Sequence, residues 1–218
     1  MNYENMNNNK VVLSGEIIKG PTFSHSVFGE GFSEMYLSIN RLSEKCDEIP
    51  VTVSERLPFA DELKEGKRVT VFGQFRSYNK FEDGKSKLML SVFARELSFD
   101  EYDGNPNSVM LTGYICKPPI FRTTPFNREI TDLLLAVNRA YNKSDYIPAI
   151  AWGRNARFAG GLNVGDRLSV NGRIQSRIYN KVLQSGQCED RVAYEVSISK
   201  ITLDGEDELY MEISADKK

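Results

Sequence analysis

An internal repeat constrains this chain of 218 residues more than any other feature. The segment 9–15, Asn-Lys-Val-Val-Leu-Ser-Gly, recurs at 107–113 as Asn-Ser-Val-Met-Leu-Thr-Gly, an offset of 98 residues. After one inserted residue the offset becomes 99, and it pairs Gly73 with Gly172. Chance similarity does not hold one register over about 65 residues. The chain is therefore a tandem duplication of one unit.

The duplication predicts two similar domains followed by a tail. We place the boundaries at 1–103 for an N-terminal domain, 104–203 for a C-terminal domain and 204–218 for an acidic tail. The joint near 100–106 carries Asp, Gly, Asn and Pro, the residues expected of a turn or linker. Each domain then has an ordinary size for a unit with its own core.

Alternating apolar residues predict that each repeat is built mainly from strands. The alternation is clear at 69–75 and at the equivalent 168–174. One short helix is expected per repeat, at 57–63 and at 156–162, the second weakened by Gly160-Gly161. Three strands, a short helix and two strands are the arrangement of an OB fold. We therefore predict an all-β protein made of two tandem OB-fold five-stranded β-barrels.

The net charge of −2 hides an uneven distribution along the chain. Residues 9–99 hold 13 basic and 13 acidic side chains, whereas residues 107–203 hold 13 basic and 7 acidic ones, for a net charge of +6. The tail 204–218 has a net charge of −4. A basic second repeat favours a polyanionic ligand such as nucleic acid, which the near-neutral total on its own would argue against.

Several motifs of the second repeat point to one family. They are the opening at 107–113, Leu-Ala-Val-Asn-Arg at 135–139, Tyr-Ile-Pro-x-x-x-Trp-Gly at 146–153, and Gly-Arg-Ile-Gln-Ser-Arg at 172–177. Through them residues 107–203 resemble a bacterial single-stranded DNA-binding protein. The first repeat resembles the same family more faintly, through its Asn9 opening, Asn40-Arg41, Ile49-Pro50 and residues 73–77.

The resemblance implies which side chains bind a nucleic-acid strand. It implies base stacking at four positions, all aromatic here: Tyr141, Tyr146, Trp152 and Tyr179. Five nearby arginines are expected to contact phosphate or to stack by their guanidinium planes: Arg122, Arg139, Arg154, Arg173 and Arg177. Binding without sequence preference needs flat aromatic faces and a basic groove, which these two sets supply. The alternative for each aromatic is ordinary packing within the sheet.

The equivalent positions of the first repeat carry no aromatic residue. They hold Ser43, Glu48, Ser54 and Lys80. Three residues beside the last position, Arg76, Tyr78 and Phe81, are expected to form an auxiliary binding site. We therefore predict that the second domain binds the strand and that the first, divergent domain serves mainly in assembly.

The sequence shows no constellation for catalysis. His25 is the only histidine, and phosphate-loop, zinc-protease and nucleophile-elbow motifs are absent. We expect no enzyme activity, no cofactor and no metal. Cys46, Cys116 and Cys188 are odd in number and far apart, which suits a reducing cytosol. Without a signal peptide or an apolar run near twenty residues, we expect a cytoplasmic, nucleoid-associated protein.

Together these observations predict a protein that coats and protects single-stranded DNA in replication, recombination or repair. Three alternatives stay open: a restart factor resembling primosomal replication protein B, a protein-interaction module on an OB fold, and an RNA-binding protein. The family assembles four OB domains, which implies a homodimer here. Its usual Pro-Phe ending, which recruits replication and repair proteins, is not present at 204–218, so such partners are in doubt.

Overall fold

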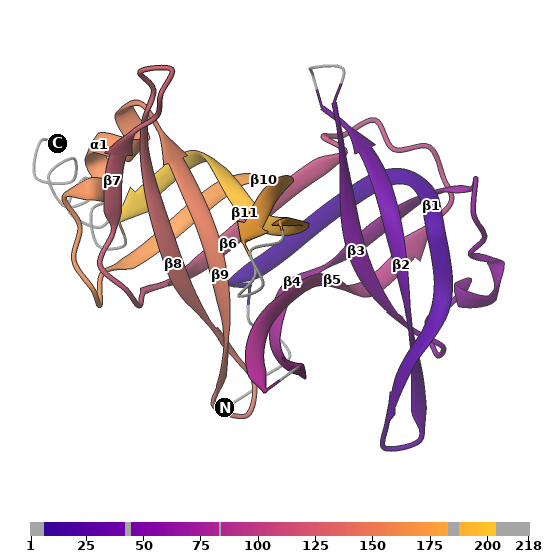
Figure 1. Cartoon of the computed structure of the whole chain (residues 1–218). Coiled ribbons are helices and arrows are strands. Elements are labelled where there is room, and N and C mark those ends of the chain that lie inside the picture. Colours follow the sequence, from indigo (N-terminus) through magenta and orange to yellow (C-terminus); the bar gives the residue numbers. More distant parts are fainter. Residues whose placement is uncertain (1–6, 42–44, 83, 183–187, 204–218) are drawn as a thin grey trace, which may run out of the picture. The chain divides into compact units, whose positions relative to one another are not determined.

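The computed structural model describes residues 7–41, 45–82, 84–182 and 188–203, and they are mostly strand (Figure 1). The first repeat contains β1 (Asn9–Val27), β2 (Glu30–Asn40), β3 (Cys46–Ser54), the 3-10 turn η2 (Ala60–Glu62), β4 (Arg68–Glu82) and β5 (Lys85–Ser98). The second contains β6 (Asn107–Ile115), β7 (Ile120–Thr123), β8 (Glu129–Arg139), β9 (Lys143–Trp152), α1 (Arg154–Gly160), β10 (Arg167–Val182) and β11 (Cys188–Leu203). The long β1 of the first repeat corresponds to the pair β6 and β7 of the second.

The strands of each repeat close into a barrel. In the first repeat β1 pairs antiparallel with β2 and β4, β2 pairs with β3, and β4 pairs with β5. A short parallel pairing of β3 with β5 completes the ring. In the second repeat the order β6-β10-β11-β9-β8 is completed by a pairing of β6 with β8. The predicted fold class is confirmed, with the strand order of an OB fold.

The repeated glycines mark the places where two strands of a barrel cross closely. A Cβ atom on Gly15 would lie 2.4 Å from the carbonyl oxygen of Ser38, and one on Gly113 would lie 2.7 Å from that of Ala136. Both distances are too short for a side chain, so the close approach of the first strand to its neighbour requires glycine in both copies. The Leu-x-Gly motif therefore reflects barrel closure.

The asparagine that opens the second repeat also has a structural role. The Asn107 side chain accepts a hydrogen bond from the Ile174 amide at 2.8 Å and donates one to the Ile174 carbonyl at 2.7 Å. It thus pairs with β10 as a backbone residue would, and it is buried. Because its polar atoms are satisfied inside the protein, Asn107 is not a candidate ligand-binding residue.

The helices differ in extent from those expected. In the first repeat η2 is a single turn that begins after Phe59, whose φ of 66° is left-handed. In the second repeat α1 is a true helix despite the adjacent glycines, and Ala156 and Ala159 are fully buried on it. Gly160 lies against Phe121, where a Cβ would be 3.2 Å from the Phe121 Cβ. Close packing, which helix propensity does not measure, accounts for the difference.

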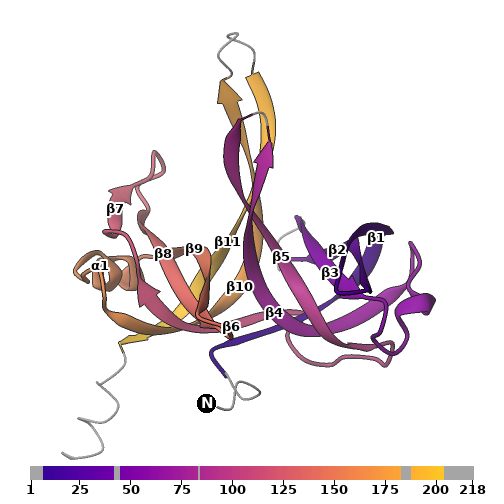
Figure 2. The ribbon, with the colours of Figure 1, turned by 90° about the horizontal axis from the view of Figure 1, so that it is seen from below.

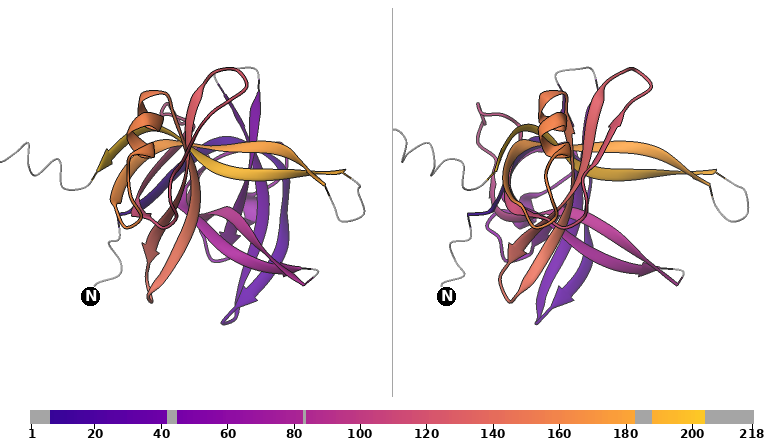
Figure 3. Two further views of the ribbon diagram at one scale, coloured as in Figure 1. Left: turned by 60° about the vertical axis from the view of Figure 1, so that its left-hand side comes forward. Right: turned by 90° about the vertical axis from the view of Figure 1, so that its left-hand side faces the viewer.

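The chain divides into two compact units. The β1–β5 unit consists of Lys10–Val109 and Arg173–Val196, and the β6–β9 unit holds the described residues 7–9, 110–172 and 197–203. The outer halves of β10 and β11 thus group with the first repeat. Figure 2 and Figure 3 show them as a long two-stranded hairpin, hereafter the β10–β11 arm. Within the described residues, no helix has the length and apolar character that crossing a membrane requires.

Candidate nucleic-acid interface

The outer face of β8 and β9 presents two of the predicted stacking residues. Tyr146 lies opposite Ala136, and Trp152 lies opposite Ile130, in one antiparallel register. Even spacing puts both rings on the same side of β9, about 20 Å apart along the strand. They are 46% and 37% exposed, whereas the alternate residues of β9, such as Ile147, point into the barrel core. This arrangement leaves the rings accessible to bases.

Tyr141 stands on the turn that joins β8 to β9. It and Asn142 adopt left-handed backbone conformations, with φ values of 61° and 52°. Its side chain is 84% exposed. The three aromatics Tyr141, Tyr146 and Trp152 therefore belong to one strand-turn-strand element of the β6–β9 unit.

Two arginines accompany these aromatics in the same unit. Arg122 on β7 lies opposite Ile130, which in turn lies opposite Trp152, so the three share one face across neighbouring strands. The Arg122 Nε is 2.7 Å from an oxygen of Asp132, in an ion pair that is open to solvent. Arg154, two residues after Trp152, is exposed at the start of α1. Solvent-exposed guanidinium groups of this kind can reach phosphate.

Three more of the predicted residues, Arg173, Arg177 and Tyr179, lie on the β10–β11 arm, in the β1–β5 unit. The guanidinium carbon of Arg177 is 5.9 Å from the centre of the Tyr179 ring, within the range of a cation–π contact. Arg177 also approaches Glu195 at 3.9 Å. The structure therefore divides the predicted site into two groups, one on β7–β9 and α1 and one on the arm.

Comparison with known protein families matches residues 106–204 to the Single-strand binding protein family. The second repeat is thus similar to this family over nearly its whole length. The single-stranded DNA-binding protein A of Bacillus subtilis is 35% identical over 88 residues, which cover 37% of this chain and 50% of that protein. The chain thus spans about half the length of the curated relatives that it matches.

Solved structures of the family extend the likeness to both repeats. The wild-type single-stranded DNA binding protein from Thermus aquaticus superposes with a TM-score of 0.67 at 25% identity, covering 89% of this chain and 92% of that one. The N-terminal domain of PriB from Thermoanaerobacter tencongensis is 42% identical over 41% of this chain, with a TM-score of 0.36.

The arginine of the Asn-Arg motif pairs with a buried carboxylate in each repeat. Arg139 lies 3.4 Å from Asp145, whose side chain is 2% exposed, and Arg41 lies 2.5 Å from Asp47, which is 1% exposed. A buried carboxylate without a partner would be strongly destabilising. Arg139 is predicted from the sequence to contact nucleic acid, and the geometry gives it a structural role within the barrel.

Asp47 forms further hydrogen bonds within the β1–β5 unit. It accepts hydrogen bonds from Arg173 at 3.1 Å and from the Ser176 amide at 2.7 Å. Burial alone would raise the Asp47 pKa, but the hydrogen bonds from Arg41 and Ser176 outweigh burial and hold the pKa below its usual value. Arg173, another predicted ligand contact, thus shares the single carboxylate of Asp47 with Arg41.

The face of the first repeat equivalent to the β8–β9 face is acidic. Glu48 occupies the position of Tyr146, and Glu34 that of Asp132. Tyr194 of the arm lies near both glutamates; burial and then Glu48 and Glu34 raise its pKa to about 12. Burial and then Glu34 likewise raise the pKa of Tyr78. Of the two glutamates only Glu48 marks a difference between the repeats, since Asp132 of the second repeat is also acidic; a carboxylate in place of Tyr146 disfavours phosphate.

The auxiliary residues proposed for the first repeat lie on β4. Arg76 stacks on Phe93 at 4.2 Å and donates a hydrogen bond to Gln74 at 2.8 Å. Tyr78 and Phe81 are exposed farther along the strand. The Arg76 side chain is engaged within the sheet, so Tyr78 and Phe81 are the more accessible part of this group.

Sequence reasoning missed a recess beside Trp152. Six further residues line it: Thr123, Asn127, Arg128, Glu129, Gly153 and Arg157. They come from the end of β7, the β7–β8 turn, the start of β8, and the segment from Gly153 into α1. The two arginines contribute to the +6 charge of the repeat, but only the fold brings them next to Trp152.

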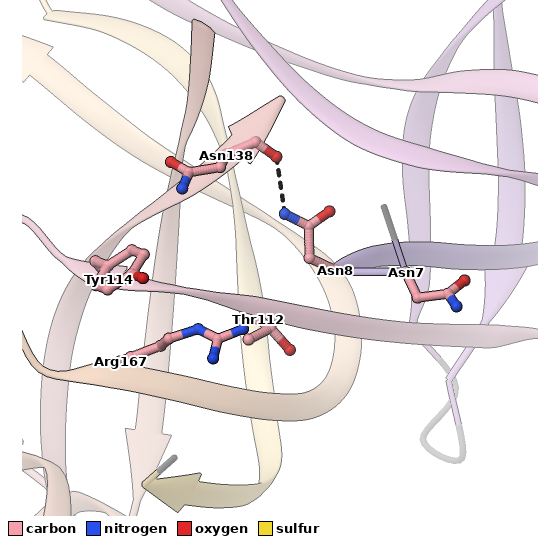
Figure 4. A pocket seen from close by; sticks show the side chains of 6 residues that line it. All are labelled: Asn7, Asn8, Thr112, Tyr114, Asn138 and Arg167. Atoms are coloured by element: carbon pink, nitrogen blue, oxygen red, sulfur yellow. Dashed lines mark hydrogen bonds between the residues drawn. The ribbon is translucent and has the colours of Figure 1, made fainter. Parts of the chain in front are cut away.

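A second, polar recess lies elsewhere in the β6–β9 unit. Figure 4 shows its lining residues, Asn7, Asn8, Thr112, Tyr114, Asn138 and Arg167. The Asn8 amide donates a hydrogen bond to the Asn138 carbonyl at 2.8 Å, which ties residues before β1 to the end of β8 (Figure 4). In the part of the chain that the structure describes, no group of three or more histidine, cysteine or acidic side chains could hold a metal ion.

Proposed function

We propose that this protein binds single-stranded DNA without catalysis and coats it during replication, recombination or repair. The observation that carries the proposal is the outer face of β8–β9, where Tyr146 and Trp152 expose flat rings on a basic repeat. Aromatic platforms beside arginines bind single strands through their base faces and phosphates, and any base can stack. The names of the family relatives support the same ligand.

Within this proposal the two repeats have different roles. Tyr141, Tyr146 and Trp152 stack bases, and Arg122 and Arg154 neutralise phosphates. Tyr179 and Arg177 on the β10–β11 arm extend the same chemistry. The first repeat, with its acidic face, contributes mainly to assembly, and a homodimer would supply four OB domains. The protein would need no cofactor or metal for this work.

Trp152 provides a direct test because it is the only tryptophan of the chain. We expect oligo-dT to quench its fluorescence, with an affinity that falls linearly with salt on logarithmic axes. Oligo-rU and duplex DNA should bind more weakly. Stronger binding of oligo-rU would assign the protein to RNA instead. The absence of quenching by every oligonucleotide at low salt would refute strand binding and favour a protein-interaction module.

A further inference from the structure

We propose that the first repeat orients part of the strand-binding surface, with Asp47 as the positioning residue for Arg177 and Tyr179. This inference rests on the proposed function and deepens it, because it gives the first repeat a task in that same site. By sequence the β10–β11 arm belongs to the second repeat, but it groups with Lys10–Val109 in the β1–β5 unit. The contacts at the base of the arm account for this grouping.

Side chains hold one edge of β10 in place of a neighbouring strand. Asn107, at the start of β6, exchanges two hydrogen bonds with the backbone of Ile174. Two residues farther along β10, and so on the same edge, the Ser176 amide donates to Asp47 at 2.7 Å and the Ser176 carbonyl accepts from Arg41 at 3.0 Å. The Arg41–Asp47 pair thus continues the hydrogen bonding of this edge beyond the start of β6.

Asp47 makes further contacts at the base of the arm. Its buried carboxylate also accepts hydrogen bonds from the Ser176 hydroxyl at 3.2 Å and from Arg173 at 3.1 Å. Hydrogen bonds to a charged acceptor are stronger than neutral ones and fix the direction of their donors. On the other strand of the arm, half-buried Tyr194 lies near Glu48 of β3. Both strands of the arm therefore meet β3 near its start.

Beyond Ser176 the arm is open to solvent. From Arg177 to Asn180 every side chain of β10 is exposed, and a two-stranded hairpin on its own is only marginally stable in water. Tyr179 follows Ser176 by three residues, about 10 Å along the strand. Its ring can meet a base only where the strand that carries it points. A strand oriented in advance loses less entropy when DNA binds.

The charge of Asp47 alone predicts the opposite effect on binding. Its carboxylate is shared by Arg41 and Arg173. Asp47→Asn removes a negative charge beside the arm, and a more positive surface favours phosphate binding. Weaker binding in this variant would therefore report a lost orientation of the arm and not the change in charge.

The first test measures the mobility of the arm in the absence of DNA. Tyr179→Trp in a Trp152→Phe background places the only tryptophan of the full chain at position 179, where its fluorescence anisotropy reports how freely the arm moves. We expect Asp47→Asn to lower this anisotropy. Asp145→Asn, the matched buried carboxylate of the β6–β9 unit, should leave it unchanged. Ser176→Ala removes only the hydroxyl donor and should lower it less, which serves if Asp47→Asn does not fold.

The second test is a double-mutant cycle on the affinity of the full chain for oligo-dT. We expect Asp47→Asn to weaken binding about fivefold in the wild-type background. Where Arg177→Ala and Tyr179→Ala are already present, the same change should weaken binding less than about twofold, because the side chains that it orients are gone. Asp145→Asn should show no such dependence on the arm. Urea unfolding confirms that each variant is folded under the conditions of the assay.

The outcomes separate this inference from the proposed function. Unchanged anisotropy at position 179 in both Asp47→Asn and Ser176→Ala would overturn the positioning role. Tighter binding by Asp47→Asn, or an equal loss in both backgrounds, would overturn it as well. If the wild-type protein does not bind oligo-dT, the proposed function fails, and the anisotropy still decides whether Asp47 holds the arm.

Discussion

Removing the Trp152 ring separates a ligand-binding role from a packing role. If Trp152 stacks on a base, Trp152→Ala should cost about 1–3 kcal/mol of binding, or about 5- to 150-fold in affinity. Trp152 lies on the outer face and is 37% exposed, so its removal should cost roughly 1 kcal/mol of stability. A core aromatic would instead cost about 3–5 kcal/mol.

The assay is anisotropy of a labelled oligo-dT, because the variant lacks the fluorophore, with urea unfolding measured in parallel. Trp152→Phe keeps a flat ring and should retain most of the affinity. Tyr146 lies about 20 Å from Trp152 along β9, so the binding free energy lost in Tyr146→Ala should add to that lost in Trp152→Ala. Tyr78→Ala in the first repeat should cost little. A large loss of stability with unchanged affinity, or equal losses in Tyr78→Ala and Trp152→Ala, would refute the reasoning.

Four more predictions concern the scaffold and the charge of the proposed binding face. Asp47→Ala leaves Arg41 without its buried partner, so urea unfolding should show a loss of about 3–5 kcal/mol. Folding lowers the Asp47 pKa, so the ionised Asp47 stabilises the fold fully above the ordinary carboxylate pKa of about 4. That stabilisation is lost as the pH falls through the lowered pKa. The free energy of unfolding, measured over a pH series, should therefore fall with acid in the wild-type protein and change less in Asp47→Asn. Gly113→Ala forces a Cβ to 2.7 Å from the Ala136 carbonyl and should lower the melting temperature by several degrees, which calorimetry would detect. Arg154→Ala should reduce the slope of log affinity against log salt by about 1.

The fold was predictable because barrel closure leaves local marks in the sequence. Gly15 and Gly113 recur at one offset because both strands pass close to a carbonyl group of a neighbouring strand, and residues alternate because one side of each strand packs on the core. The length of α1 was not predictable from propensity. Gly160-Gly161 argues against a helix, and the benefit of Gly160 depends on Phe121, which is distant in sequence.

The residues of the candidate site stay a prediction, and the structure adds where each side chain lies and what it contacts. The resemblance identified Tyr146 and Trp152, and strand parity places both on the outer face. It could not distinguish a phosphate-binding arginine from one that neutralises a buried carboxylate, because the burial of Asp145 beside Arg139 is a property of the fold. Arg157 and Glu129, 28 residues apart, meet only where α1 approaches the start of β8.

The two repeats allow residues that stabilise the barrel to be compared with residues that we propose bind the strand. Positions that kept their residues in both copies have the same internal role, since Arg41 binds Asp47 as Arg139 binds Asp145. Positions on the outer face diverged, and Glu48 stands where Tyr146 stands in the second copy. Had both copies bound the same ligand through this face, the aromatic positions would be as alike as the ion pairs. The contrast favours the second repeat as the main strand-binding surface of our proposal. The first repeat shares with it the barrel and the buried ion pair but not the exposed aromatic residues.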